Sequence, residues 1–321
     1  MHYALPYKTK QFFFVLIKLS IVIGAGYFIY QKLITNPDLD FNTFIQLTSK
    51  NGILSLKNSI ILVVLSFLNW FLEIIKWQYL ASVVKKISFK DALHQSLGAL
   101  TASLFTPNRI GEYGAKAIFY NKPYRKKILL VNLLSNIMQM SITLALGIIG
   151  FSIYSNSYDI AVNYYKIARF LTLLLTIIVL IILGITQKRY KIKGISIQRI
   201  RDFVMRFPKS KLHLGILLSL GRYLIFSFQF FVILYFFKVN ITYLEAIPVI
   251  TSMYLITSIL PSIFIFDVVI KGSVAVYLFS LLGINDLIIL STITIMWLLN
   301  FVIPSIFGSF YVLNFKFSAQ N

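Results

Sequence analysis

The sequence contains no cysteine, which excludes disulfide bonds, thiolate chemistry and cysteine-ligated metal sites. Its three histidines, His2, His94 and His213, share no spacing that would bring them to one metal ion. A glycine-rich loop of the P-loop or dinucleotide-binding type is also missing, because Gly111 and Gly114 alone are too close together to form one. No Ser-His-Asp set can be assembled. We therefore predict no metal, no cofactor and no catalytic residues, and expect that the protein is not an enzyme.

Acidic residues are scarce: 10 aspartates and glutamates stand against 31 lysines and arginines, giving a formal net charge of +21. Such a charge can indicate nucleic-acid binding. Here, however, the basic residues lie in short loops between apolar runs, a pattern that fits anionic lipid headgroups and the positive-inside rule. We predict that the partners are membrane lipids with an anionic headgroup, and that nucleic acid is not a partner.

Long apolar runs fill the rest of the chain, in which 58% of the 321 residues are hydrophobic. Several runs reach or approach the roughly 20 residues that a membrane-spanning helix needs. The sequence predicts an all-α polytopic membrane protein, with a single membrane domain over residues 1–321. The first span is expected to be a retained helix, because no small-residue cleavage site stands out. About six spanning helices are predicted, at 12–30, 59–84, 128–154, 167–186, 212–237 and 287–314.

Two further apolar regions, 88–121 and 243–281, are interrupted by polar residues. On either side of Pro107, each apolar arm of the first region has about 14 residues. At about 1.5 Å per residue such an arm reaches about 20 Å, which is less than the roughly 30 Å of a bilayer core. We predict that both regions are re-entrant helical hairpins, whose broken backbone is buried in protein or lines a wet cavity.

The two predicted hairpins resemble each other in sequence. The block 87–93 aligns without a gap with 241–247, and a proline follows each block at the same distance, at Pro107 and Pro261. Chance similarity between apolar segments is the alternative explanation. We predict an internal repeat in which each copy carries one hairpin. The copies span about 58–155 and about 212–315.

The charges of the loops predict how the chain is oriented. The basic loops 84–91, 121–127 and 187–211 would lie in the cytoplasm with both termini, and 187–211 is expected to hold a short amphipathic helix on the membrane surface. The first hairpin then opens from the cytoplasm and the second from outside. Inverted repeats with broken helices that meet near the bilayer midplane are typical of transporters. We predict a multi-pass protein of the cytoplasmic membrane.

Charged residues inside the hairpins are candidates for a binding site. Glu112 and Lys116 lie one helical turn apart and can form an ion pair that serves structure alone. In the functional interpretation, Arg109 and Lys116 present positive charge to an anionic headgroup, and Glu112 holds the cations or carries a coupling proton. The second hairpin offers Asp267 and Lys271 at the corresponding positions.

Three charged residues within the spans are secondary candidates. Glu73 and Lys76 are three residues apart, share a helix face and can neutralise each other. Arg222 lies inside a span, and we expect it to meet an acid such as Asp267 or Glu73, because an unpaired charge in the bilayer is costly.

The stretch 106–112, TPNRIGE, resembles the proline-glycine motif of the flippase-like membrane domain of lysylphosphatidylglycerol synthases, which also occurs in stand-alone proteins. Length and helix layout agree over nearly the whole chain, while the specific match covers about 92–120. The resemblance assigns Pro107 and Gly111 to the substrate site together with the charged residues of the hairpins. The soluble aminoacyl-transferring domain of the complete synthases is not present in this sequence. The resemblance therefore implies lipid translocation rather than lysine transfer.

Our preferred hypothesis from the sequence is the translocation of a phospholipid or a lipid-linked headgroup between the two membrane faces. Two alternatives remain open at this point. The first is a membrane-embedded transferase that acts on a lipid carrier, for which Asp38 and Asp40 are the paired acids. The second is a non-catalytic partner subunit of a lipid or glycan pathway, which would recruit other proteins through the basic loop 187–211.

Overall fold

The computed structural model describes residues 41–104, 106, 110–158, 191–192, 195–259 and 267–315, together with six single positions between 16 and 27. Within these residues the chain is helical, apart from a hairpin of two short strands, β1 (Lys191–Ile192) and β2 (Ile195–Ser196). Four helical segments are long and apolar enough to cross a membrane. They are α3 (Leu56–Ala81), α6 (Lys122–Ser157), α9 (Lys209–Phe236) and the continuous segment Asp286–Asn314.

The all-α prediction is therefore confirmed, with four of the six expected spans. The other two predicted spans, 12–30 and 167–186, lie outside the described residues except for the six single positions. The segment Asp286–Asn314 consists of α12 (Asp286–Trp297), a π-helical turn η2 (Leu298–Val302) and α13 (Ile303–Asn314). The shorter helices are α2 (Phe41–Lys50), α4 (Phe89–Ser103), α5 (Gly111–Ile118), α8 (Ile197–Met205), α10 (Tyr243–Ile259) and α11 (Asp267–Ser280).

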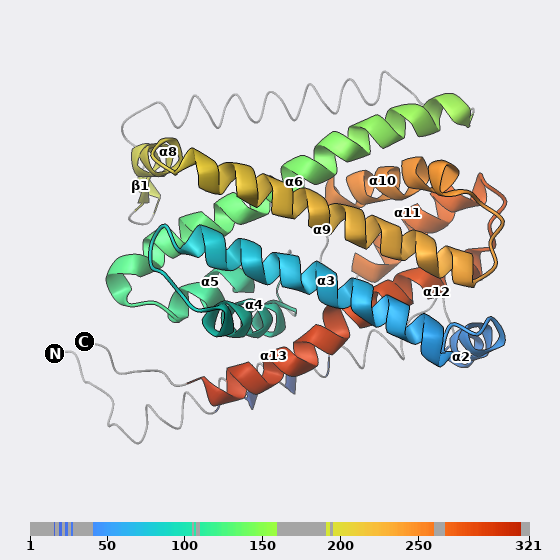
Figure 1. The fold of residues 1–321 in the computed structure, drawn as a ribbon, viewed down its shortest axis with the longest axis horizontal. Coiled ribbons are helices and arrows are strands. Elements are labelled where there is room, and N and C mark those ends of the chain that lie inside the picture. Colours follow the sequence, from blue (N-terminus) through green and yellow to red (C-terminus); the bar gives the residue numbers. More distant parts are fainter. Residues whose placement is uncertain are drawn as a thin grey trace.

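Helices α3 and α9 pack side by side through the middle of the molecule (Figure 1). The pair α4–α5 falls within the first predicted hairpin, and α10–α11 falls within the second. The first pair leaves and rejoins the long helices at the left-hand end of Figure 1, whereas the second does so at the right-hand end. The depth of either pair in a membrane remains a prediction.

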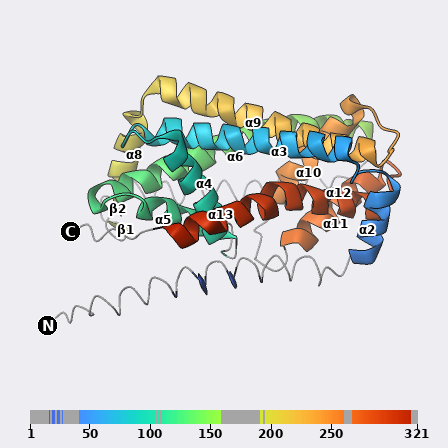
Figure 2. The same cartoon turned by 60° about the horizontal axis from the view of Figure 1, so that its bottom comes forward.

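Each short pair packs on a long helix of the other half of the chain. Helix α4 lies between α3 and α13 (Figure 2), and α10 packs along α6. Glycines allow both crossings, since a Cβ added at Gly308 would collide with Leu97 O and Thr101 Oγ1, and one added at Gly147 would collide with Leu255. Close helix packing through small residues is a common way to join helices in membranes, where lipid removes the hydrophobic driving force.

The first turns of α4 and α10 are built in the same way. Ser88 and Asp91 form a capping box: the Ser88 N–H and hydroxyl donate to Asp91 Oδ2 at 3.2 and 2.7 Å, and the Asp91 N–H donates back to Ser88 Oγ. Thr242 and Glu245 repeat this arrangement at 2.8 and 2.7 Å. The aligned blocks 87–93 and 241–247 thus encode the same helix start.

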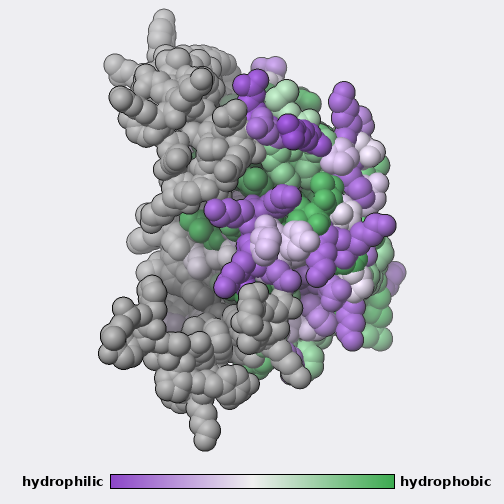
Figure 3. Space-filling view, turned by 90° about the vertical axis from the view of Figure 1, so that its left-hand side faces the viewer, coloured by the Kyte–Doolittle hydropathy of each residue, from purple (hydrophilic) through white to green (hydrophobic). Residues whose placement is uncertain are grey.

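Charge is distributed unequally between the two ends of the molecule. Hydrophilic side chains gather on the end that carries α8 (Figure 3). The exposed cations of that end are Lys85, Lys86, Lys90, Lys122, Arg125, Lys126, Lys127, Arg201, Arg206 and Lys209. At the other end the exposed charges among the described residues are Lys50, Lys57, Lys238, Glu245 and Asp286.

The sides of the bundle are apolar. Large hydrophobic residues are exposed on the outer faces of the long helices, for example Phe67 on α3, Ile148 on α6 and Phe307 on α13. Exposed apolar surface on this scale is expected where lipid, rather than water, surrounds a protein.

Candidate functional site

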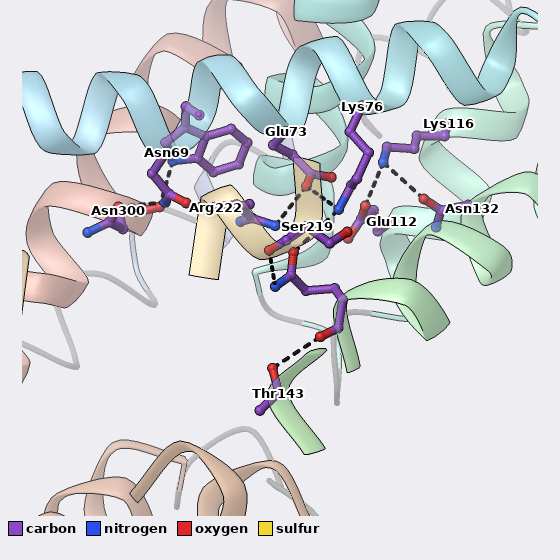
Figure 4. A network of polar contacts seen from close by, with 12 residues as sticks. Asn69, Glu73, Lys76, Glu112, Lys116, Asn132, Thr143, Ser219, Arg222 and Asn300 are labelled. Carbon is purple, nitrogen blue, oxygen red and sulfur yellow. Dashed lines mark hydrogen bonds and ion pairs between the residues drawn. The ribbon is translucent and has the colours of Figure 1, made fainter. Parts of the chain in front are cut away.

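Five charged side chains from three helices meet in the middle of the molecule (Figure 4). We call them the charge cluster: Glu73 and Lys76 of α3, Glu112 and Lys116 of α5, and Arg222 of α9. The Glu73 carboxylate contacts Lys76 Nζ at 2.8 Å and Arg222 at 2.7 Å, and Glu112 contacts Lys116 Nζ at 2.7 Å. The side chains of Lys76 and Lys116 are each only 1% exposed. These groups are therefore removed from water and depend on one another for compensation.

Lys116 is held on three sides. Besides Glu112, its ammonium donates to Asn132 Oδ1 of α6 at 2.9 Å and lies 4.1 Å from the centre of the Trp77 ring. A cation over an indole face is stabilised by the ring quadrupole, more strongly where water is excluded. Residues from α3, α5 and α6 thus fix the position of this charge.

Arg222 links α9 to α3 within the charge cluster. Its Nε donates to Asn69 Oδ1 at 3.0 Å, while its terminal nitrogen donates to Glu73. The side chain is 22% exposed, more than the other partners in the ion pairs of the cluster. Of the three cations, Arg222 is therefore the one best placed to meet a ligand.

An uncharged network continues from Asn69 toward α12–α13. Asn300, in the π-helical turn η2, accepts hydrogen bonds from Ser66 Oγ at 3.1 Å and Asn69 Nδ2 at 2.9 Å, and donates to Gln229 Oε1 at 2.9 Å. We call these four residues the amide hub. The extra residue of a π-helical turn changes the direction of nearby side chains, and such turns are frequent at functional sites.

Gln139 of α6 connects helices beside the charge cluster, as Asn300 does in the amide hub. Its Nε2 donates to the Ser219 carbonyl at 3.3 Å, and its Oε1 accepts from Lys76 Nζ at 3.5 Å. Gln139 therefore joins α6 to both α9 and α3, as Asn300 joins η2 to both helices.

A small cavity of about 40 Å³ opens within the charge cluster. Its walls include Glu73, Glu112, Lys116, Arg222 and Ser96. The hydroxyl of Ser96 is buried and has no hydrogen-bond partner among the described residues. A larger cavity of about 650 Å³ lies between α11 and α12, but the charged residue that lines it, Asp286, is exposed. The buried charged side chains therefore line the smaller cavity and not the larger one.

The structure brings together five of the residues singled out in the sequence, namely those of the charge cluster. It selects Glu73 as the partner of Arg222 and contains both expected ion pairs. Gly111 starts α5, and its N–H donates to Thr106 Oγ1 at 3.0 Å. Lys271 lies half-buried on α11 and does not line the small cavity. Pro107, Arg109 and the side chain of Asp267 lie outside the described part of the chain.

The sequence analysis missed the uncharged members of the site. Ser96, Asn132, Gln139 and Asn300 are each buried or hydrogen-bonded beside the charges. Amide side chains inside apolar spans were the available signal, because polar groups in a membrane are costly and seek partners. Within the described residues, no group of three or more histidines and acids is arranged to hold a metal ion.

Four long apolar helices around a buried cluster of charges define a multi-pass membrane protein. The model of the family described as Lysylphosphatidylglycerol synthase TM region matches residues 15–308, and the chain belongs to this family. No match was found among curated proteins or among solved structures. The family places the protein in lipid pathways of the membrane.

Proposed function

We propose that the protein translocates a phospholipid or a lipid-linked headgroup across the cytoplasmic membrane, with the charge cluster as the binding site for the negative headgroup. The observation that carries this proposal is the composition of the cluster: among the described residues, three cations face two carboxylates. Excess positive charge in a dry site attracts a phosphate group far more strongly than the same charge does in water.

An inverted repeat of the two halves supports this function, and the mirrored contacts support the repeat. Three polar residues of α3, Ser66, Asn69 and Lys76, each have a polar residue of α9 exactly 153 positions later. These are Ser219, Arg222 and Gln229. Asn300 contacts Ser66 and Gln229, whereas Gln139 contacts the counterparts of both, Ser219 and Lys76.

The third pair of counterparts, Asn69 and Arg222, bond directly to each other. A residue touches its own counterpart only near the symmetry axis, so the proposed two-fold axis passes close to this contact. The glycine crossings obey the same relation, since Leu97 and Thr101 correspond to Thr251 and Leu255 when the alignment of the two blocks is continued without a gap. In many transporters the substrate site lies at such a repeat interface. The charge cluster borders the axis from the side of the first half.

The distribution of exposed cations supports an orientation for this transporter. The end that carries α8 would face the cytoplasm, because positive loops are retained on that side. The first hairpin would then be a re-entrant element entered from the cytoplasm, and the second would be entered from outside.

The experiment that tests the proposal is leaflet exchange of labelled phospholipids in liposomes that contain the purified protein. We expect faster exchange than in empty vesicles, and loss of this gain in Arg222→Gln, which removes the exposed cation of the cluster. Arg206→Gln is the matched control, since Arg206 is exposed at the basic end. Mass spectrometry of the recovered lipid distinguishes translocation, which leaves the mass unchanged, from group transfer. Exchange equal to that of empty vesicles across anionic, zwitterionic and lipid-linked substrates would refute the proposal.

A further inference from the structure

Counted over the described residues, the charge cluster carries one more positive than negative charge. Among the described residues, Lys76, Lys116 and Arg222 face only Glu73 and Glu112, and none of the five side chains is more than 22% exposed. A net charge away from water is costly, and more so between helices that cross a membrane. Either a proton is missing from one of the bases, or a negative group other than the described side chains completes the site.

The size of the cavity restricts the ligand. Its volume, counted as the space open to the centres of water-sized spheres, is about 40 Å³, and by the same measure one water molecule needs about 10–15 Å³. The cavity therefore has room for a small ion together with one or two water molecules. It is too small in this conformation for a whole phosphoglycerol headgroup, which would need the surrounding helices to move apart.

Several hydrogen-bond donors in the cavity wall have no acceptor among the described residues. Arg222 has five N–H donors, and Asn69 and Glu73 account for two of them. The Ser96 hydroxyl lines the cavity without a partner among the described residues. Asn136 gives one of its two amide hydrogens to Tyr113, which leaves the second for a ligand.

The carboxylates in the cavity wall do not cancel this preference. Glu73 is bound by two cations and Glu112 by Lys116, so each already directs an oxygen at a positive group. Ser96 Oγ and Asn136 Oδ1 also line the cavity and could accept from a cation, but a cation would add to the net positive charge of the described side chains. An anion would find Arg222, Lys116 and the Ser96 hydroxyl among the residues that line the cavity.

We propose that this cavity binds one small monovalent anion of the halide class, with chloride as the physiological occupant. Arg222 and Lys116 supply the charge, and Ser96 and Asn136 supply neutral donors. The binding of the anion does not depend on lipid transport. A second consequence does rest on the proposed function: the lipid phosphate must displace the anion, so chloride competes with the transported lipid.

Halide binding can be measured on the full-length protein in detergent after exchange into gluconate. Titration with chloride or bromide, followed by calorimetry and by thermal unfolding, is expected to show one saturable site in the wild type. Ser96→Ala should weaken binding about tenfold or more, as expected for loss of a hydrogen bond to a charged group. Arg222→Gln should abolish it. Ser291→Ala is the matched control, because Ser291 is also buried and also lacks a hydrogen-bond partner in the described part of the chain, but lies on α12 and does not line the cavity.

The location and the source of the anion need separate readouts. In crystals grown with bromide, the anomalous signal should lie between Arg222 and Ser96. Equal halide affinity in the wild type and in Ser96→Ala would overturn the site. Because Ser96→Ala removes only one oxygen atom, it keeps the test valid even when Arg222→Gln does not fold. Absence of halide binding would also overturn the site. Native mass spectrometry then identifies what neutralises the cluster. A phospholipid that is retained by the wild type and lost in Arg222→Gln would be the anion, whereas a protein without bound lipid or halide would have a cluster neutralised by loss of a proton.

The same samples separate this inference from the proposed function. Halide binding without lipid exchange in liposomes leaves the anion site standing and refutes translocation. Lipid exchange without halide binding supports translocation and refutes the anion site. If both hold, exchange should be slower in chloride than in gluconate, and Ser96→Ala should reduce that difference.

Discussion

The surroundings of Gln139 and Asn300 are two versions of one arrangement. Each amide joins a long helix to both α3 and α9. Around Asn300 every partner is neutral, whereas Gln139 contacts Lys76, which belongs to the charge cluster. The same backbone framework therefore holds a neutral hub on one side of the proposed axis and a charged site on the other.

This difference indicates a division of roles between the halves. A buried amide network whose members satisfy one another can fix a single geometry without attracting a ligand. A buried cluster with an excess cation gives up stability unless a ligand completes it. We infer that the amide hub holds α3 and α9 in register, and that the charge cluster recognises the substrate.

The largest effect is expected from removing the shared acid of the charged side. In Glu73→Gln, Lys76 and Arg222 lose their common counter-charge. Breaking a buried ion pair from one side costs about 3–5 kcal/mol, measurable by SDS titration in mixed micelles. Asp286→Asn, which removes an exposed acid, should leave stability unchanged. If Glu73→Gln lowers the free energy of unfolding by less than Asn300→Leu does, the charge cluster is accessible to water.

A smaller loss is expected on the neutral side. Asn300→Leu leaves Gln229 Oε1 and Asn69 Nδ2 without their partner, while Asn69 retains its bond to Arg222. We expect about 2–3 kcal/mol, because each buried polar group left unpaired costs about 1–3 kcal/mol. Halide affinity in the same samples should change less than in Ser96→Ala. If halide affinity falls as far in Asn300→Leu as in Ser96→Ala, the amide hub belongs to the binding site and the division of roles is wrong.

The two glycine crossings test whether the halves are equivalent in packing. Gly308→Ala places a methyl group against the Leu97 carbonyl, and Gly147→Ala places one against Leu255. Overpacking costs about 1–3 kcal/mol, because each new methyl group meets a backbone carbonyl or a Cβ that can move only with its helix. Stability in detergent should fall by similar amounts in both variants. An alanine tolerated at one crossing alone would break the proposed correspondence.

The sequence was sufficient to predict the helices and the local charge pairs. Apolar runs located the four long helices, and the spacing of Glu112 and Lys116 predicted their contact, because residues four apart on a helix are neighbours. The same reasoning paired Glu73 with Lys76. These features depend on short-range geometry, which the order of residues determines directly.

Contacts between distant helices could be predicted only in part. Because an unpaired charge in a membrane is costly, the sequence predicted an acidic partner for Arg222, and both Glu73 and Asp267 were candidates. The packing of α3 beside α9 brings Glu73 to Arg222. Nothing local in the sequence shows that a π-helical turn would aim Asn300 at Asn69, or that the Ser96 hydroxyl would line a cavity. Such contacts depend on helix crossings that residues far apart in the chain create.

The smallest effect concerns the helix starts that the two halves share. At α10 the Thr242 hydroxyl and backbone N–H donate to Glu245, and these bonds hold the pKa of the Glu245 carboxyl below its usual range. A group whose pKa is lowered by folding stabilises the folded state at neutral pH and loses this contribution as the pH falls through its folded pKa. Amide exchange in the first turn of α10 should therefore show protection at neutral pH that acid removes.

Glu245→Gln separates this local effect from the general pH dependence of exchange. The variant should exchange faster than the wild type at neutral pH, and the two should converge in acid once the wild-type carboxyl is protonated. Asp91→Asn provides the corresponding change at the start of α4, where Ser88 makes the same pair of bonds. If the first turn of α4 loses protection in Asp91→Asn as that of α10 does in Glu245→Gln, the aligned blocks act as equivalent helix starts. A loss at one helix alone would mean that the blocks share a sequence but not a structural role.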